Sequence, residues 1–245
     1  MKKIFFSLLF LIPIVFVESA LAQTVNVDFG AEGGSATRQI IRLIALITIL
    51  SLAPSILMMV TSFTRIIVVF SLLRSAIGIQ QTPPNSVLIS LALFLTAFIM
   101  APTFEKAYED GIAPLMEEKI TEKEAFDKVT APFHAFMLSQ VREADLALFT
   151  DIAKVEPPKE KEDIAFRILV PSFMISELKR AFEIGFLIFV PFLIIDMMVA
   201  STLMSMGMMM LPPVLISLPF KVIFFVLVDG WHVLSESLVK SFGVY

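Results

Sequence analysis

The sequence contains no cysteine, and only two histidines, His134 and His232, occur among its 245 residues. Without cysteine the chain can form neither a disulfide nor a thiolate metal site. A zinc site or a serine–histidine pair is not expected, because the chain has only two histidines and they are far apart in the sequence. The sequence also lacks a glycine-rich phosphate-binding loop, so ATP use is not expected. These absences predict a protein that is not an enzyme and that holds no cofactor or metal ion.

Charged residues are scarce as well. They make up 17% of the chain, whereas 57% of the residues are hydrophobic and the mean hydropathy is +0.87. In an ordinary soluble domain about a quarter of the residues are charged, so this composition predicts a membrane protein with several apolar helices. The formal net charge of −4 offers no general case for nucleic-acid binding.

The first 22 residues have the pattern of a secretory signal peptide. Two lysines precede an apolar stretch, and Ala20 and Ala22 supply the small residues of a cleavage site. We predict cleavage after Ala22, with retention as an uncleaved anchor as the alternative. Cleavage would place the new N-terminus outside the cytoplasm, followed by a polar and flexible lead-in, residues 23–39.

The first hydrophobic hairpin is expected at residues 40–102, where a turn at 80–85 separates two apolar runs. We expect Pro102 to stop the second run, because proline lacks the N–H that continues a helix. The run from Val87 to Ala101 would then have fifteen residues, fewer than the roughly 20 that cross a bilayer upright. This shortness favours a hairpin arm buried in protein over a full membrane span.

The second hydrophobic hairpin is expected at residues 171–245, in which prolines interrupt the last apolar run. Asp196 and Lys221 are isolated charges in this region. Isolated charges in apolar helices usually face a partner or a wet cavity. We therefore hypothesise that these two residues pair with each other and so fix the packing of the hairpin.

Between the hairpins, residues 103–170 carry an excess of acidic over basic residues. The stretch from Gly33 to Phe104 has no acidic residue and includes Arg65 and Arg74. Basic residues favour the cytoplasmic side of membrane segments. The region of the two arginines is therefore expected inside the cell, and the acidic segment outside it, in the periplasm. This orientation agrees with a cleaved leader.

The acidic segment has a helical pattern. Thr121 and Glu124 fit a capping box at a helix start, and Pro132 suits the first turn of a further helix. Aromatic and aliphatic residues then recur at helical spacing. They could build a local core or contact a neighbouring subunit, and Phe136 and Phe149 are the candidate inter-subunit contacts.

Charged residues that precede the third apolar run, Ile184 to Met204, raise a similar question. Glu177 has helical pair spacing to Arg180, as Lys179 has to Glu183. Exposed pairs of this kind contribute little to stability, which favours a solvated helix end. The alternative makes Glu177 a third candidate for an inter-subunit contact.

Methionine is concentrated in one stretch, because seven of the fourteen methionines lie between Pro191 and Pro213. Methionine is unbranched and has a soft sulfur, so it re-packs around changing neighbours. Gly207 loosens the backbone, and the closing proline pair discourages continuation of the helix. The stretch is therefore either an apolar helix end that faces lipid or core, or a flexible loop that closes a passage.

Two motifs in the second hairpin carry a resemblance to a known family. PSFMISELKRAFEIG at Pro171–Gly185 and PFLIIDMMVAS at Pro191–Ser201 closely resemble the paired signatures of the FliP/SctR family of type III export-gate proteins. TSFTRIIVVFSLLRSAIGIQQTPPN at Thr61–Asn85 resembles the first hairpin of the same family. The resemblance covers nearly all of the chain after the leader, and the leader and length favour the flagellar branch.

The resemblance implies an all-α membrane protein whose proline-broken hairpins stack obliquely in a pentamer-like helical ring. In the family, several copies assemble with FliQ and FliR, work with the FlhA and FlhB export components, and pass unfolded flagellar subunits through a lumen. The ring lies within the flagellar basal body at the bacterial inner membrane, in contact with lipid and raised toward the periplasm. The family's methionine gasket corresponds here to Met208, Met209 and Met210, with Met206 as an additional candidate.

Two other functional classes compete with an export gate. An ion- or proton-conducting transporter could use Asp196 and Lys221, since transporters also have broken helices and midplane charges; yet one acid and one base are few for a relay. An intramembrane enzyme would need a nucleophile with a nearby base. The serines of the apolar runs, Ser201, Ser205 and Ser217, have no histidine near them in sequence and are interpreted as packing or back-bonded hydroxyls.

Overall fold

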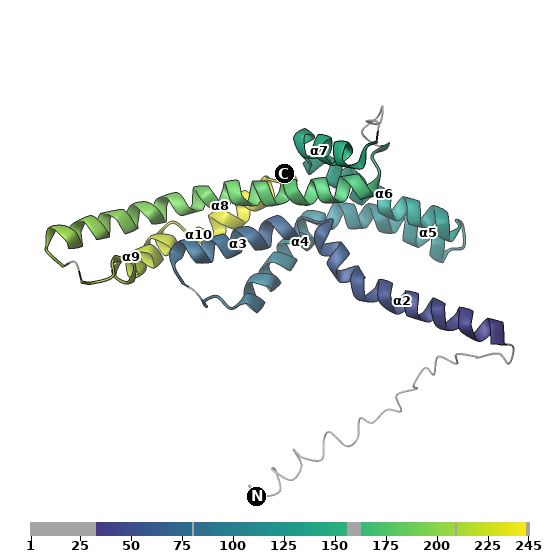
Figure 1. Cartoon of the computed structure of the whole chain (residues 1–245), viewed down its shortest axis with the longest axis horizontal. Coiled ribbons are helices and arrows are strands. Elements are labelled where there is room, and N and C mark those ends of the chain that lie inside the picture. The colour runs from purple at the N-terminus through teal and green to yellow at the C-terminus, as the bar shows by residue number, and fades with distance from the viewer. Residues whose placement is uncertain (1–32, 80, 156–162, 209, 244–245) are drawn as a thin grey trace, which may run out of the picture. The chain divides into compact units, whose positions relative to one another are not determined.

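The computed structural model describes residues 33–79, 81–155, 163–208 and 210–243. Every regular element in these ranges is a helix (Figure 1), so the all-α prediction is confirmed. The elements are α2 (Gly33–Met59), α3 (Phe63–Ile77), α4 (Asn85–Ala107), the π-helix η2 (Tyr108–Ile112), α5 (Ala113–Met116), α6 (Glu122–Gln140), α7 (Glu143–Ala153), α8 (Phe166–Ser205), α9 (Pro213–Leu227) and α10 (Gly230–Lys240). The chain divides into two units, Met1–Ser51 and Leu52–Tyr245, and the core and the site described below lie in the second.

Prolines lie inside the long helices and do not end them. α4 runs through Pro102, and the helical path continues through η2 and α5 as far as Met116. The prediction that Pro102 stops this run is therefore wrong. α8 contains Pro171 and Pro191 within 40 residues of helix, which Figure 1 shows as one continuous ribbon. A proline removes a single backbone donor, and long apolar helices tolerate that loss where neighbouring groups satisfy the freed carbonyl.

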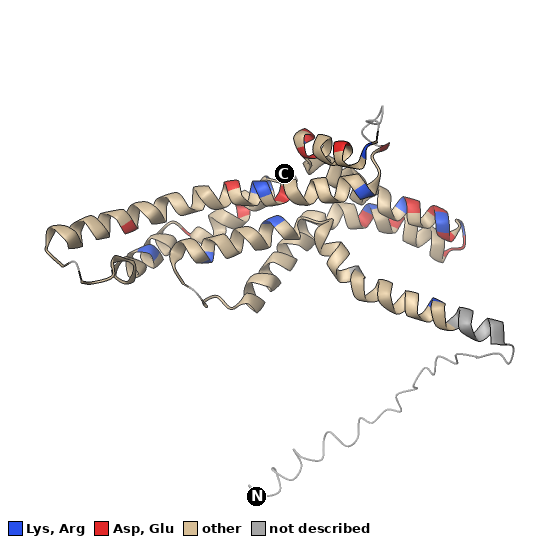
Figure 2. Ribbon diagram, viewed as in Figure 1, with Lys and Arg blue, Asp and Glu red and all other residues tan. Residues whose placement is uncertain are grey.

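α8 is longer than one bilayer crossing requires. Its 40 residues span about 60 Å at about 1.5 Å per residue, roughly twice the hydrocarbon thickness of a membrane. The charged residues of α8 lie before Ile184, with Asp196 as the exception. Figure 2 shows that charged residues are dense on α6 and α7, whereas the far half of α8 is almost free of them. α8 is thus one long helix, and the run that begins at Val87 is likewise part of a long helix and not the fifteen-residue arm expected from the sequence.

The main core lies where α3 packs along α8. The buried apolar residues of α3 recur every three or four positions, which is the stripe of an amphipathic helix. They are Phe63, Ile66, Val69, Phe70, Leu73, Ala76 and Ile77. They form one cluster with apolar residues of α4, α8 and α10. Gly185 permits the close approach of α8, since a Cβ at this position would lie 2.3 Å from Cδ1 of Leu72.

A smaller cluster joins α6 and α7 to the start of α8, and its buried members include Met137 and Phe173. Phe136 is half-buried beside it. Its ring centroid lies 6.0 Å from that of Phe173 and 6.2 Å from that of Phe242. Phe136 therefore contributes to a local core, which is the first of its two expected roles. Phe149 of α7 is also half-buried, and an inter-subunit contact of either phenylalanine stays a prediction.

Three helices are long and apolar enough to cross a membrane: the part of α2 from Ile40, the helical path from Asn85 to Met116, and α8. α9 and α10, which are bent by 62° at their junction, would make a fourth span if they are taken together. The chain itself buries only 28% of the apolar window of the second helix and 17% of that of α8. Most of this apolar surface is therefore left for lipid or for other subunits.

α6 begins with the capping box expected from the sequence, whereas Pro132 lies inside α6 and starts no helix of its own. The Thr121 hydroxyl accepts a hydrogen bond from the backbone N–H of Glu124 at 3.3 Å, and a Glu124 carboxylate oxygen accepts one from the backbone N–H of Thr121 at 2.9 Å. The backbone N–H of Thr121, and then its hydroxyl, lower the pKa of Glu124. The charged form of the Glu124 carboxylate therefore forms the capping box.

We expect the first turn of α6 to loosen as the pH falls. A carboxylate whose pKa is lower in the folded state stabilises the fold fully above its unfolded pKa, and it loses this contribution as the pH drops through the folded value. Amide hydrogen exchange of residues 122–125, corrected for the intrinsic rate, should therefore accelerate as the pH falls below the ordinary pKa of a glutamate, while the last turn of α6 stays protected. Glu124→Gln should remove this pH dependence; an unchanged profile in the variant would contradict the assignment.

Candidate functional site

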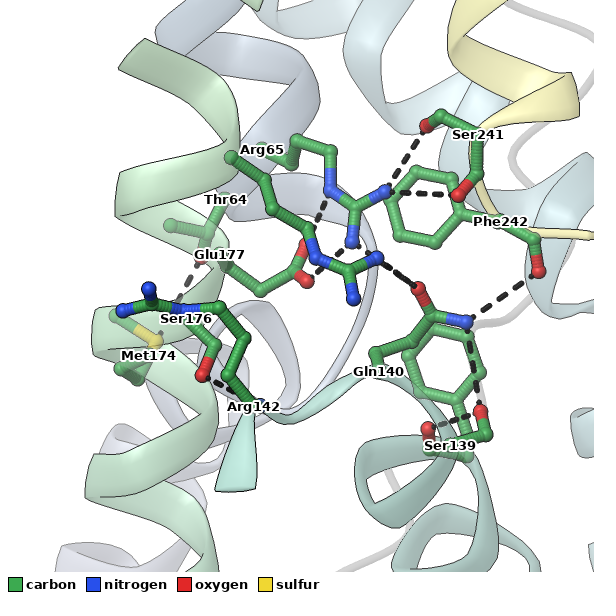
Figure 3. A network of polar contacts seen from close by, with 12 residues as sticks. Thr64, Arg65, Ser139, Gln140, Arg142, Met174, Ser176, Glu177, Ser241 and Phe242 are labelled. Carbon is green, nitrogen blue, oxygen red and sulfur yellow. Dashed lines mark hydrogen bonds and ion pairs between the residues drawn. The ribbon is translucent and has the colours of Figure 1, made fainter. Parts of the chain in front are cut away.

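Arg65 is the centre of a buried polar network, shown in Figure 3. The residue lies on α3 and is fully buried. Its guanidinium forms a two-pronged ion pair with Glu177 of α8, in which Nε donates to Oε2 at 2.8 Å and Nη2 donates to Oε1. Nη2 also donates to Gln140 Oε1 of α6 at 3.1 Å, and Nη1 donates to Ser241 Oγ, just after α10, at 2.9 Å. One side chain thus joins four segments of the chain.

The same network holds the C-terminal end of the described chain. The guanidinium carbon of Arg65 lies 3.7 Å from the centroid of the Phe242 ring, which is a cation–π distance. Gln140 Nε2 donates to the Phe242 carbonyl at 3.4 Å, and Arg180 Nη1 donates to Gln140 Oε1 at 3.3 Å. Buried ions are tolerated when their donors and acceptors are paired, and these contacts provide that pairing.

The burial of Arg65 and Glu177 corrects two expectations from the sequence. Arg65 is enclosed in an ion pair, so it is not a free charge at a membrane surface, and the orientation expected from the sequence stays a prediction. Glu177 has no exposed surface in the single chain, so it is neither a solvated helix end nor available to a neighbouring subunit. The exposed pair Lys179–Glu183 is present as expected, at 3.8 Å. No local pattern pairs Arg65 with Glu177, because 112 positions separate them.

A second polar cluster, the hairpin clasp, consists of Asp196 on α8 with Ser217 and Lys221 on α9. Lys221 Nζ lies 2.6 Å from Asp196 Oδ2, so the pairing hypothesised from the sequence is present in the structure. The hydroxyl of Ser217, one turn before Lys221, donates to Asp196 Oδ1. Lys221 Nζ also donates to the carbonyl of Ala76 at 3.2 Å, in the last turn of α3. The carbonyls of a final helical turn lack intrahelical partners and carry the negative end of the helix dipole, so this ammonium ties three helices together.

The methionine loop, residues 206–212, lies between α8 and α9, and its residues 206–208 and 210–212 are described. Gly207 adopts a φ of +74°, a conformation that suits glycine. Its N–H donates to the Met204 carbonyl at 3.1 Å, and the N–H of Met208 donates to the Leu203 carbonyl at 3.0 Å. These two bonds form a Schellman motif, which ends α8. Pro213 then starts α9 as its first residue, a position where the missing N–H costs no hydrogen bond.

The candidate gasket residues Met206, Met208 and Met210 are all exposed in this loop. The fourth candidate, Met209, lies outside the described residues, as do Ala20 and Ala22 of the expected cleavage site. The hairpin therefore presents flexible thioethers at its tip, at the far end of α8 from the Arg65 network (Figure 1). The methionine density, Gly207 with the proline pair, and the family resemblance are the sequence signals that indicated this tip.

Known proteins are similar to this chain in sequence over most of its length. The family model of the FliP family matches residues 46–238. The chain is 59% identical over 225 residues to the flagellar biosynthetic protein FliP of Caulobacter vibrioides, which covers 91% of this chain and 84% of that protein. It is 55% identical over 202 residues to the flagellar biosynthetic protein FliP of Bacillus subtilis, which covers 82% of this chain and 91% of that protein.

Breaking the Arg65–Glu177 pair should destabilise the chain strongly. Arg65→Met or Glu177→Met leaves a buried charge without its counter-ion, which costs about 3–5 kcal/mol. Removing both charges with Arg65→Met and Glu177→Met should cost less than either single change. The free energy of unfolding in detergent measures these effects. Glu183→Ala, in the exposed pair on the same helix, is the control and should change it by less than about 1 kcal/mol. Additive single-variant effects would show that the pair is not coupled.

For the hairpin clasp, Asp196→Asn should be more damaging than Lys221→Met. The side chain of Lys221 is only 5% exposed, whereas that of Asp196 is 32% exposed. Loss of the carboxylate therefore strands a buried ammonium, while loss of the ammonium leaves a carboxylate that reaches water. Protease resistance of the α8–α9 hairpin should fall most in Asp196→Asn and recover when Lys221→Met is added. Lys240→Met, at an exposed pair on α10, is the matched control; the opposite ranking would overturn this account.

Proposed function

The chain belongs to the FliP family of flagellar biosynthetic proteins, and from that premise we propose that several copies of it form the channel of the flagellar type III export gate. Membership of the family gives the chain a role in flagellar biosynthesis. In the proposed assembly, unfolded flagellar subunits pass through a lumen that the copies enclose. The methionine loops close this lumen between substrates.

The main support for an assembly is the apolar surface that one chain leaves uncovered. On the far half of α8, Phe186 is 69% exposed and Leu187 is 68% exposed, and on α9 Leu227 is 79% exposed. Soluble monomers rarely expose large contiguous apolar patches, and such patches mark contacts with membrane or protein. Because α8 is about twice as long as a bilayer is thick, lipid can cover only part of it. Other copies of the chain are proposed to cover the rest.

The methionine loop supports the proposed seal. Its backbone hydrogen bonds place an exposed, glycine-containing turn at the tip of a two-helix hairpin. Thioether side chains adapt their shape to different neighbours, so a ring of such loops can close a narrow lumen and re-pack around many substrate sequences. The hairpin clasp would hold each loop at a fixed position relative to α3, since it fixes α9 against α8 and α3.

The proposed partners are FliQ and FliR within the ring and the FlhA and FlhB export components beside it. The proposed location is the bacterial inner membrane within the flagellar basal body, with the acidic helices α6 and α7 on the periplasmic side. The concentration of charged residues on α6 and α7 (Figure 2) supports a position of these helices in water. Membrane lipid would contact the apolar helices that remain at the rim of the ring.

An ion- or proton-conducting transporter is the weaker alternative. It would need Asp196 and Lys221 to bind and release an ion during transport. In the clasp, each charge is instead engaged by the other, with Ser217 and the Ala76 carbonyl as additional partners. This arrangement favours a structural role for the pair. A catalytic role has no support from these contacts.

The test of the proposed seal is the replacement of Met208, Met209 and Met210 by alanine. Shorter side chains should leave the lumen open, so the ion conductance of membranes that contain the assembled complex should rise severalfold. Met116→Ala removes an exposed methionine of α5 and should leave the conductance unchanged. Native mass spectrometry must show the same multi-copy complex for all variants. Unchanged conductance in an intact complex would contradict the seal, and a monomer in every preparation would contradict the ring.

A further inference from the structure

The network around Arg65 joins two guanidinium groups to one carboxylate. Arg65 occupies both carboxylate oxygens of Glu177. Arg180 lies three residues after Glu177 on α8 and is half-buried. Its Nη1 donates to Gln140 Oε1 at 3.3 Å, and the same oxygen accepts from Nη2 of Arg65 at 3.1 Å. Because a guanidinium keeps its proton in proteins, this cluster carries one uncompensated positive charge.

The carboxylates near Arg180 on α7 and α8 are committed to other cations. Asp145 accepts two hydrogen bonds from Arg142, at 2.9 Å and 2.8 Å. Glu183 has helical pair spacing to Arg180, but it pairs with Lys179 at 3.8 Å. Among the described residues, Arg180 forms no ion pair. The described part of one chain therefore provides no carboxylate that compensates this guanidinium.

We propose that Arg180 is an inter-subunit contact and that its guanidinium binds a carboxylate on α6 or α7 of the neighbouring copy. The N–H donors of a guanidinium form a fork that matches the two oxygens of a carboxylate. α6 and α7 carry acidic residues in their first turns, and they pack against the first half of α8, which also carries Arg180. Neighbouring copies in a ring are related by rotation, so residues at one level of a copy meet residues at a similar level of the next. This inference rests on the multi-copy assembly of the proposed function.

The loss of Arg180 should have different consequences for one chain and for the assembly. Within one chain, the charge of Arg180 repels the buried Arg65 and attracts the buried Glu177, and these two effects oppose each other. In the assembly, removal of the guanidinium leaves the carboxylate of the next copy unpaired in an interface, which is strongly unfavourable. A residue that serves only the fold of the single chain would not show this difference.

The first measurement is the stability of the complex in Arg180→Gln. The full-length chain is co-expressed with FliQ and FliR, and native mass spectrometry of a dilution series gives the concentration at which copies dissociate. Arg180→Gln should raise this concentration at least about tenfold. Lys240→Gln removes the same charge from an exposed pair and should leave it unchanged.

The free energy of unfolding of the dissociated chain in detergent completes this measurement. It should be unchanged in both variants, because Arg180→Gln removes a repulsion and an attraction together. A complex of unaltered stability in Arg180→Gln would overturn the proposal. A destabilised single chain would overturn it as well, since Arg180 would then act within its own chain.

The second measurement identifies the partner of Arg180. In Arg180→Lys, a carbodiimide can join the introduced amine directly to a carboxylate in contact with it, with loss of water. Peptide mass spectrometry should find position 180 joined to an acidic residue of α6 or α7 in a covalent dimer of this chain. The unaltered chain, which has no amine at this position, is the control. A bond confined to one chain, a bond to FliQ or FliR, or no bond would contradict the assignment.

The outcomes separate this inference from the proposed function. If the unaltered chain forms a multi-copy complex and Arg180→Gln forms the same complex with equal stability, the contact is wrong and the ring stands. If the unaltered chain is a monomer in every preparation, the ring fails, and the contact fails with it. A complex that weakens only in Arg180→Gln, together with the cross-link to a second copy, supports the proposal in full.

Discussion

The ion pair between Arg65 and Glu177 is the constraint on which the described core depends. A buried guanidinium without its carboxylate, or a buried carboxylate without its guanidinium, costs several kcal/mol. The pair is complete only when α3 and α8 lie side by side, and its remaining donors need Gln140 of α6 and Ser241 after α10. Four segments must therefore be in place together, which makes their packing cooperative.

α8 connects the Arg65–Glu177 pair to the methionine loop. The helix is continuous for 40 residues, so the position of Glu177 determines where every later residue of α8 lies. At about 1.5 Å per residue, Asp196 follows about 28 Å further along the helix axis. There the clasp ties α9 to α8 and to the last turn of α3. The loop is thus held by two polar anchors along one helix, while the apolar surface between them is left to lipid or to other subunits.

Local features of the structure could be predicted because their signals lie within a few residues of one another. The capping box of α6 needs only Thr121 and Glu124, and the end of α8 needs only Gly207 and the prolines that follow it. The apolar composition likewise predicted membrane helices, since the length of an apolar run is itself local information. The family motifs between Pro171 and Ser201 also identified the family, which the comparisons confirm.

The sequence by itself therefore determined the helical class, the membrane character, the family and the methionine-rich tip. Only the tertiary structure decided that Arg65 and Glu177 are buried partners, that Pro102 and Pro191 lie inside helices, and that Phe136 packs in a local core. The physical reason is the range of the interactions. Helix signals act through neighbouring backbone groups, whereas the burial of a charge or an aromatic ring depends on which distant segment packs against it.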